Sequence, residues 1–145
     1  MFKFKTRVLG AVMATAMIAA VAAAVPANAA KGNTQDRGWN FGISNTYAYS
    51  TPQDKLDDSY CYVLVQRNER MTIMHTQIMG RGVAWTNQTI AGSVDLKRNV
   101  QYSVRNTVNE SLLGQAALRG SAGPNEILIA SGVWSPDSVG VYTIV

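Results

Sequence analysis

The stretch Asn99-Val-Gln-Tyr-Ser-Val-Arg-Asn-Thr-Val108 carries the plainest periodicity in this chain of 145 residues. Polar residues alternate with apolar ones, which are Val100, Tyr102, Val104 and Val108, and Asn106 takes one apolar position. Successive side chains of a β-strand point to opposite faces of a sheet, so a period of two predicts a strand with one buried face. A helix would repeat its apolar residues at roughly every third or fourth position instead.

Similar short runs lie on both sides of this stretch, and polar or Gly/Pro-containing turns separate them. The runs cover residues 39–43, 60–65, 71–79, 83–90, 127–130 and 133–134. Residues 114–119 fit either a short strand or a helical turn. About seven to nine short strands, with a turn signal roughly every 8–12 residues, predict an all-β antiparallel sandwich or barrel. We expect it to form a single domain over residues 37–145.

The first 29 residues have the layout of a secretory signal peptide. A basic start (residues 1–7) precedes an uncharged apolar stretch (residues 8–25), and Pro26 and Ala27-Asn28-Ala29 follow. This pattern predicts a helical signal peptide that is cleaved after Ala29, a flexible leader over residues 30–36, and a secreted product. The alternative is an uncleaved membrane anchor, in which this segment would be the only contact with a membrane.

Removal of this segment changes the charge of the protein. The whole chain has 13 basic and 9 acidic residues, but Lys3, Lys5 and Arg7 belong to the signal segment. The remaining chain would have 10 basic against 9 acidic residues and a net charge of +1. Binding to nucleic acid depends on clustered basic charge, so we expect no nucleic-acid partner.

The sequence offers few groups for catalysis or metal binding, and we predict no catalytic residues, no metal and no cofactor. Cys61 and His75 are the only residues of their types. We expect Cys61 to be a buried small side chain, although a reactive thiol or an intermolecular disulfide is the alternative. A hairpin centred near Asn68 and Glu69 would place Cys61 opposite Thr76 and leave His75 on the other face. Asp54, Asp57 and Asp58 could form a weak calcium site but fit a solvated acidic loop better.

The aromatic residues provide the candidates for ligand binding. Most of them alternate within predicted strands and are expected in the core. Tyr47 and Tyr49 lie instead in a polar connection, and with Trp85 they are the residues we expect to bind a ligand by stacking. A cell-envelope glycan or an extracellular protein is the expected partner, and packing of these rings on the surface is the alternative.

Three segments carry a resemblance to a known family. They are residues 130–140 (Ala-Ser-Gly-Val-Trp-Ser-Pro-Asp-Ser-Val-Gly), residues 32–36 (Gly-Asn-Thr-Gln-Asp) and residues 104–110 (Val-Arg-Asn-Thr-Val-Asn-Glu). They resemble small exported proteins of Gram-positive bacteria that form a domain of unknown function with a closing Trp-Ser-Pro-Asp-Ser motif. That motif corresponds here to Trp134, Ser135, Pro136, Asp137 and Ser138. The resemblance implies a bacterial exported protein and no particular activity.

The motif itself can be interpreted from its residues. Trp134 is expected to anchor the core, and Ser135–Ser138 to form a turn, because Pro136 and Asp137 suit turn positions. A recognition loop is the alternative. For the whole protein, we expect a non-enzymatic exported binding module. The alternatives are a bacteriocin-like antagonistic factor and a small extracellular hydrolase, whose pair of carboxylates would come from Asp95, Glu110, Glu126 or Asp137.

Overall fold

The computed structural model describes residues 32–44, 47–69, 73–121, 126–140 and 142–145. The predicted signal peptide lies outside the described residues. Within them the chain forms eleven β-strands: β1 (Arg37–Ser44), β2 (Tyr47–Tyr49), β3 (Gln53–Asp54), β4 (Cys61–Asn68), β5 (Ile73–Arg81), β6 (Trp85–Asn87), β7 (Val94–Lys97), β8 (Gln101–Val104), β9 (Gln115–Ser121), β10 (Ile127–Ser135) and β11 (Thr143–Ile144). No helix of the described part is long and apolar enough to cross a membrane.

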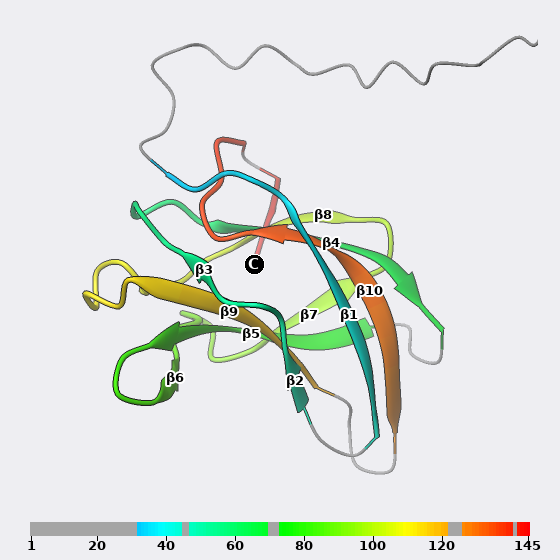
Figure 1. Cartoon of the computed structure of the whole chain (residues 1–145). Coiled ribbons are helices and arrows are strands. Elements are labelled where there is room, and N and C mark those ends of the chain that lie inside the picture. The colour runs from blue at the N-terminus through cyan, green and yellow to red at the C-terminus, as the bar shows by residue number, and fades with distance from the viewer. Residues whose placement is uncertain (1–31, 45–46, 70–72, 122–125, 141) are drawn as a thin grey trace, which may run out of the picture.

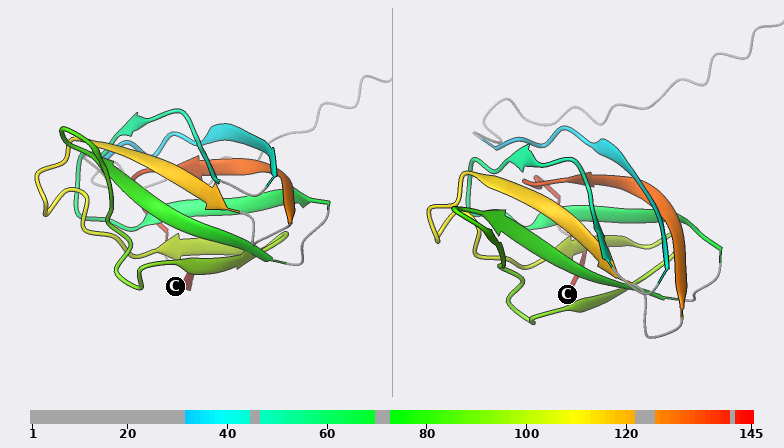
Figure 2. Two further views of the ribbon diagram at one scale, coloured as in Figure 1. Left: turned by 90° about the horizontal axis from the view of Figure 1, so that it is seen from below. Right: turned by 60° about the horizontal axis from the view of Figure 1, so that its bottom comes forward.

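The strands form two sheets that face each other as two curved layers (Figures 1 and 2). Sheet A has the order β1-β10-β4-β8-β11. Sheet B has the order β2-β9-β5-β6, and the short strands β3 and β7 pair with β9 and β5. All strand pairs are antiparallel except β11 with β8. The prediction of an all-β fold is therefore confirmed, as a sandwich of two sheets and not a closed barrel. The sequence predicts seven to nine strands and the fold has eleven. Four of the eleven, β2, β3, β6 and β11, have only two or three residues each.

The core lies between the two sheets, and the alternation of the sequence places it there. In β5 the side chains of Met74, Thr76 and Ile78 are fully buried, as their shared face predicts. Sheet A contributes the largest buried side chains, Trp134 and Phe41, to the same core. Residues 114–119, which fit either a strand or a helical turn, belong to β9.

The strand expected over residues 99–108 is shorter than its alternation suggests. Strand β8 ends at Val104, and Asn106 makes only an isolated bridge to Thr89. The Asn106 side chain is nevertheless buried, because its amide donates to Val104 O at 3.2 Å and its oxygen accepts from Val108 N at 3.3 Å. These local bonds replace the strand ladder at the point where a polar residue stands in the apolar series.

The expected hairpin between the strands around Cys61 and His75 is wrong. Strand β4 pairs with β10 and β8 in sheet A, whereas β5 pairs with β9, β7 and β6 in sheet B. The chain therefore crosses from one layer to the other between β4 and β5, and Cys61 does not face Thr76 (Figure 1). Both strands still contribute to the core, β4 with Val63 and Val65 from sheet A and β5 with Met74 and Ile78 from sheet B.

Candidate functional site

The outward face of sheet B brings together the three aromatic residues that the sequence singles out. Tyr47 and Tyr49 lie on β2, which pairs with β9, and Trp85 begins β6 at the opposite edge of the sheet. The polar sequence around Tyr47 and Tyr49 predicts that both rings reach solvent, and they are 50% and 37% exposed. We call the set Tyr47, Tyr49, Gln77, Arg81, Trp85 and Arg119 the aromatic face.

The rings of the aromatic face contact one another. Tyr49 stacks on Trp85 with the ring centroids 5.7 Å apart and an interplanar angle of 21°. Tyr47 meets Tyr49 edge-on, with centroids 5.5 Å apart. Strand pairing places Met79 and Ala117 on this same outward side, between β2 and β6, yet both are buried, because the rings meet above the two intervening strands. The result is a continuous aromatic surface across sheet B.

Two arginines complete this surface, and no sequence pattern indicated either of them. The guanidinium carbon of Arg119 lies 3.9 Å from the centroid of the Tyr47 ring, and Arg119 Nη1 donates to Gln77 Oε1 at 2.8 Å. Arg81 lies 5.6 Å from the centroid of Trp85. Cation–π contacts at exposed sites are worth about 0.5–1 kcal/mol each. The face therefore offers flat apolar rings bordered by hydrogen-bond donors.

A row of polar residues lies beside the aromatic face. Strand pairing aligns Ser121, His75 and Asp95 across β9, β5 and β7, and His75 Nδ1 is 2.6 Å from Asp95 Oδ1. These are the residue types of a hydrolytic triad, but the Ser121 hydroxyl donates to the backbone oxygen of His75 at 3.5 Å. A nucleophile needs its base within hydrogen-bond reach, so this row has the composition of a triad without its geometry.

The turn after β10 forms a second, buried cluster. In the Trp134–Ser138 segment the side chains of Trp134, Ser135, Pro136 and Asp137 are buried. Asp137 Oδ1 lies 2.7 Å from Lys55 Nζ, and neither side chain is exposed to solvent. Asp137 Oδ2 accepts from the backbone N–H groups of Asn33, at 2.5 Å, and Leu56, at 3.0 Å. Two of the segments that carry the family resemblance, residues 32–36 and 130–140, are therefore hydrogen-bonded to each other.

Asp57 belongs to the same cluster, which we call the Lys55–Asp137 cluster. Its side chain is hydrogen-bonded to that of Asp137, and Gly32 packs so closely that a Cβ there would contact both aspartates. Burial acts to raise the pKa of Asp57, but hydrogen bonds from Ser59 and Asp137 and the charge of Lys55 together hold the pKa below its ordinary value. The neighbouring groups of the cluster thus set the pKa of the half-buried Asp57.

Cys61 lies below the same turn and is fully buried. Its Sγ donates to Pro136 O at 3.1 Å and accepts from Asn106 Nδ2 at 3.3 Å. Burial raises the pKa of the Cys61 thiol to about 12, an effect that the charge of Lys55 opposes. The thiolate is the reactive form of cysteine, so this position favours an inert thiol. His75 is in the other sheet, on its outward face, and the two residues do not form a dyad.

The three aspartates considered for a calcium site, Asp54, Asp57 and Asp58, do not form a metal-binding group. Among the described residues, no group of three or more His, Cys, Asp or Glu side chains could hold a metal ion. Asp54 accepts from Gln115, Asp58 accepts from Asn109, and Asp57 accepts from Ser59 N. Of the carboxylates proposed for hydrolysis, Asp95 pairs with His75 on the surface of sheet B, and Asp137 pairs with the buried Lys55.

Comparison with known proteins shows the family of this chain. Curated proteins and solved structures give no match to it. A family model described as "Protein of unknown function (DUF2712)" matches residues 25–138. The matched range ends at the last residue of the Trp134–Ser138 turn. It includes both the aromatic face and the Lys55–Asp137 cluster. Because the match spans most of the 145 residues, the expectation of an uncharacterised family is confirmed, and the chain belongs to the DUF2712 family.

Proposed function

We propose that this protein is an exported, non-enzymatic binding module and that its aromatic face binds a glycan of the bacterial cell envelope. The observation that carries the proposal is the stack of Tyr49 on Trp85, with Tyr47 edge-on beside it, in a surface that spans sheet B. Sugar rings present flat C–H faces, and aromatic side chains offer rigid contact area at a low cost in conformational entropy.

The polar groups at the border of the face suit the hydroxyls of a sugar. Gln77 and Arg119 are hydrogen-bonded to each other beside Tyr47, and the exposed Arg81 lies next to Trp85. A glycan ligand needs apolar stacking for affinity and a few placed donors and acceptors for orientation. The near-neutral charge that remains without residues 1–29 also suits a neutral or weakly charged polymer better than nucleic acid.

Binding to isolated envelope polysaccharides and to peptidoglycan tests this proposal directly. Purified wild-type protein, Tyr49→Ala and Trp85→Ala are incubated with each insoluble glycan, and the bound fraction is measured over a range of protein concentrations. Loss of one stacking ring is worth about 0.5–1.5 kcal/mol, so we expect each variant to bind roughly 2- to 10-fold more weakly than wild type.

Tyr142→Ala is a matched control for these variants. Tyr142 is 36% exposed, nearly the same as Tyr49 at 37%, but it packs against Tyr62 on sheet A. We expect this variant to bind like wild type. Absence of wild-type binding to every envelope glycan, or equal losses for Tyr49→Ala and Tyr142→Ala, would refute the assignment. Assaying the same incubations for released reducing ends tests the hydrolase alternative.

Export is tested separately from binding. We expect the culture medium or cell wall of the producing cell to contain a chain whose first residue is Ala30, because signal peptidase requires the small residues at positions 27 and 29. Intact-mass analysis of the recovered protein identifies its N-terminus. A chain that retains residues 1–29 in the cell membrane would contradict cleavage and favour the anchored alternative.

A further inference from the structure

The Lys55–Asp137 cluster places a primary amine against a carboxyl group inside the fold, which is an unusual arrangement for a lysine. Lysine side chains are almost never fully buried, because removing the ammonium group from water is costly. Here Lys55 Nζ and Asp137 Oδ1 are 2.7 Å apart, and both side chains have no exposed surface. Lys55 lies between β3 and β4 and Asp137 follows β10, so the contact joins positions 82 residues apart.

The geometry of the cluster matches what formation of an amide bond requires. Since Nζ is 2.7 Å from Oδ1, it lies within about 4 Å of the carboxyl carbon of Asp137, close to the separation of an attacking pair. Nζ also donates to Ser59 O at 2.6 Å, which fixes the direction of the amine. The other carboxyl oxygen, Oδ2, accepts hydrogen bonds from the backbone N–H groups of Asn33 and Leu56. Two such donors stabilise the negative oxygen that develops when a nucleophile adds to the carbonyl carbon.

Asp57 supplies a group that can move protons in this reaction. Its side chain lies beside that of Asp137, since a Cβ at Gly32 would contact both, and it lies close enough to Lys55 for that charge to lower its pKa. The Asp57 carboxyl group can therefore take a proton from the ammonium group and pass it to Asp137. Removal of charge from the buried amine and carboxylate also favours the neutral product.

We propose that Lys55 and Asp137 become covalently joined by an intramolecular isopeptide bond. Nζ of the neutral Lys55 amine attacks Cγ of Asp137, and the tetrahedral intermediate places its negative charge on Oδ2. The Cγ–Oδ1 bond then breaks as the Nζ–Cγ bond becomes an amide. The ammonium group gives up two protons, both reach Oδ1 by way of Asp57, and Oδ1 leaves as water. The step needs no oxidant, reductant or other reactant.

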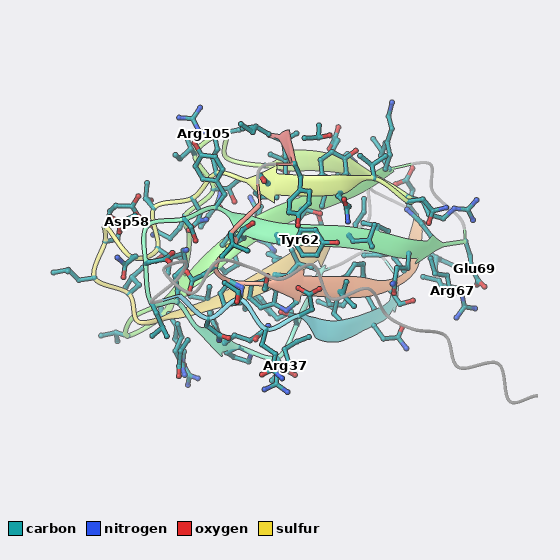
Figure 3. The ribbon with its side chains drawn as sticks, turned by 90° about the horizontal axis from the view of Figure 1, so that it is seen from above. Arg37, Asp58, Tyr62, Arg67, Glu69 and Arg105 are labelled. Carbon is teal, nitrogen blue, oxygen red and sulfur yellow. The ribbon has the colours of Figure 1, made fainter. Side chains whose placement is uncertain are left out.

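The released water has a short route to solvent. A hollow of about 240 Å³ on sheet A has Asp137 in its wall, together with Asp36, Tyr62 and Ser138. Figure 3 shows Tyr62 over the middle of sheet A, on the face that looks away from the core. The Lys55–Asp137 cluster shares no residue with the aromatic face, so this proposal does not depend on the proposed function.

The intact mass of the protein recovered from the producing cell is the decisive measurement. We expect the mass to be lower than the sequence requires by one water, about 18 Da. Proteolysis and fragmentation should give a branched peptide that joins Lys55 to Asp137, with no tryptic cleavage after Lys55. An unmodified mass would overturn the proposal whatever the variants do. Dehydration at Asp58 or Asp137 as a succinimide would also overturn it, and hydroxylamine, which cleaves a succinimide but not an isopeptide bond, distinguishes the two.

Substitutions test which residues form the isopeptide bond and which residue assists its formation. Lys55→Arg and Asp137→Ala should both have their full calculated masses, and Asp57→Asn should contain a large fraction of chains that keep the water. Asp58→Asn is the matched control, because Asp58 is the adjacent but exposed carboxylate, and it should be dehydrated like wild type. In a denaturing gel the joined chain should migrate faster than Lys55→Arg, because a covalent link across 82 residues keeps the denatured chain compact. Equal migration of wild type and Lys55→Arg would contradict the link.

Discussion

Gly132 lies where the chain has no room for a side chain, and Gly132→Ala tests the packing of sheet A. Gly132 belongs to β10, between β1 and β4, at a register shift in the β10–β4 pairing. A Cβ added there would overlap the backbone carbonyl oxygen of Leu64 and lie 2.9 Å from the Trp39 ring. Because the first clash is with backbone of a central strand, a change of side-chain rotamer cannot relieve it.

The cost of Gly132→Ala follows from that geometry. Overpacking a core usually costs about 1–3 kcal/mol, and a clash with backbone belongs at the upper end, so we expect about 3 kcal/mol. The midpoint of thermal unfolding should fall by about 10 °C or more in a domain of this size. Urea unfolding followed by tryptophan fluorescence measures the effect, because Trp39 and Trp134 are buried.

Gly42→Ala is the matched control. Gly42 lies on β1 in the same sheet, and a Cβ there would contact no atom within 4 Å. Alanine should be neutral there, or stabilise the fold by a few tenths of a kcal/mol, because it restricts the unfolded chain. Equal stabilities of the two alanine variants would show that β10 does not approach β4 in the way described.

Three further predictions concern the buried thiol, the core and the cation–π contact. Burial raises the pKa of Cys61 above its ordinary value, so its contribution to stability is complete below about pH 9 and is lost as the pH rises toward 12. The stability difference between wild type and Cys61→Ala should shift by about 1 kcal/mol against wild type between pH 8 and pH 10 in urea unfolding, and a constant difference would contradict the burial. Leu118→Ala should cost about 2–5 kcal/mol in the same assay, because Leu118 is fully buried between the sheets, and a cost below 1 kcal/mol would be inconsistent with that position. Arg119→Met removes the contact with Tyr47 and the hydrogen bond to Gln77 and should cost about 1–2 kcal/mol, whereas an unchanged unfolding midpoint would show that neither contact persists in solution.

The alternation of the sequence predicts which residues form strands but not which strands pair. Met74, Thr76 and Ile78 share a buried face as expected, since the period of two depends only on neighbouring residues. The partners of a strand depend on contacts between distant segments, and the polar residues 67–70 suggested a hairpin that the fold does not contain. The period of a sequence pattern does not determine which distant strands pair.

At the aromatic face and at the Lys55–Asp137 cluster, too, the sequence predicts local properties but not contacts between distant residues. The polar surroundings of Tyr47 and Tyr49 indicate exposure, and the topology alone brings Trp85 to them across the sheet. The exposure of Lys55 and Leu56 is the reverse of what their residue types predict. The charged Lys55 is 2% exposed, while the adjacent apolar Leu56 is 55% exposed. Its partner Asp137 lies so far along the chain that no local pattern could link the two residues.

The pairing of β1 with β10 has a consequence for the order in which the protein can be made. The first strand of the domain finds its sheet partner only in residues 127–134, near the other end of the chain (Figure 1). While a ribosome is still adding the middle of the protein, β1 has nothing to pair with, and sheet A cannot close. A chain delivered N-terminus first through a narrow export channel would therefore stay unfolded until almost its last residue had passed. The topology itself therefore delays closure of sheet A until β10, which lies near the C-terminus, has been made.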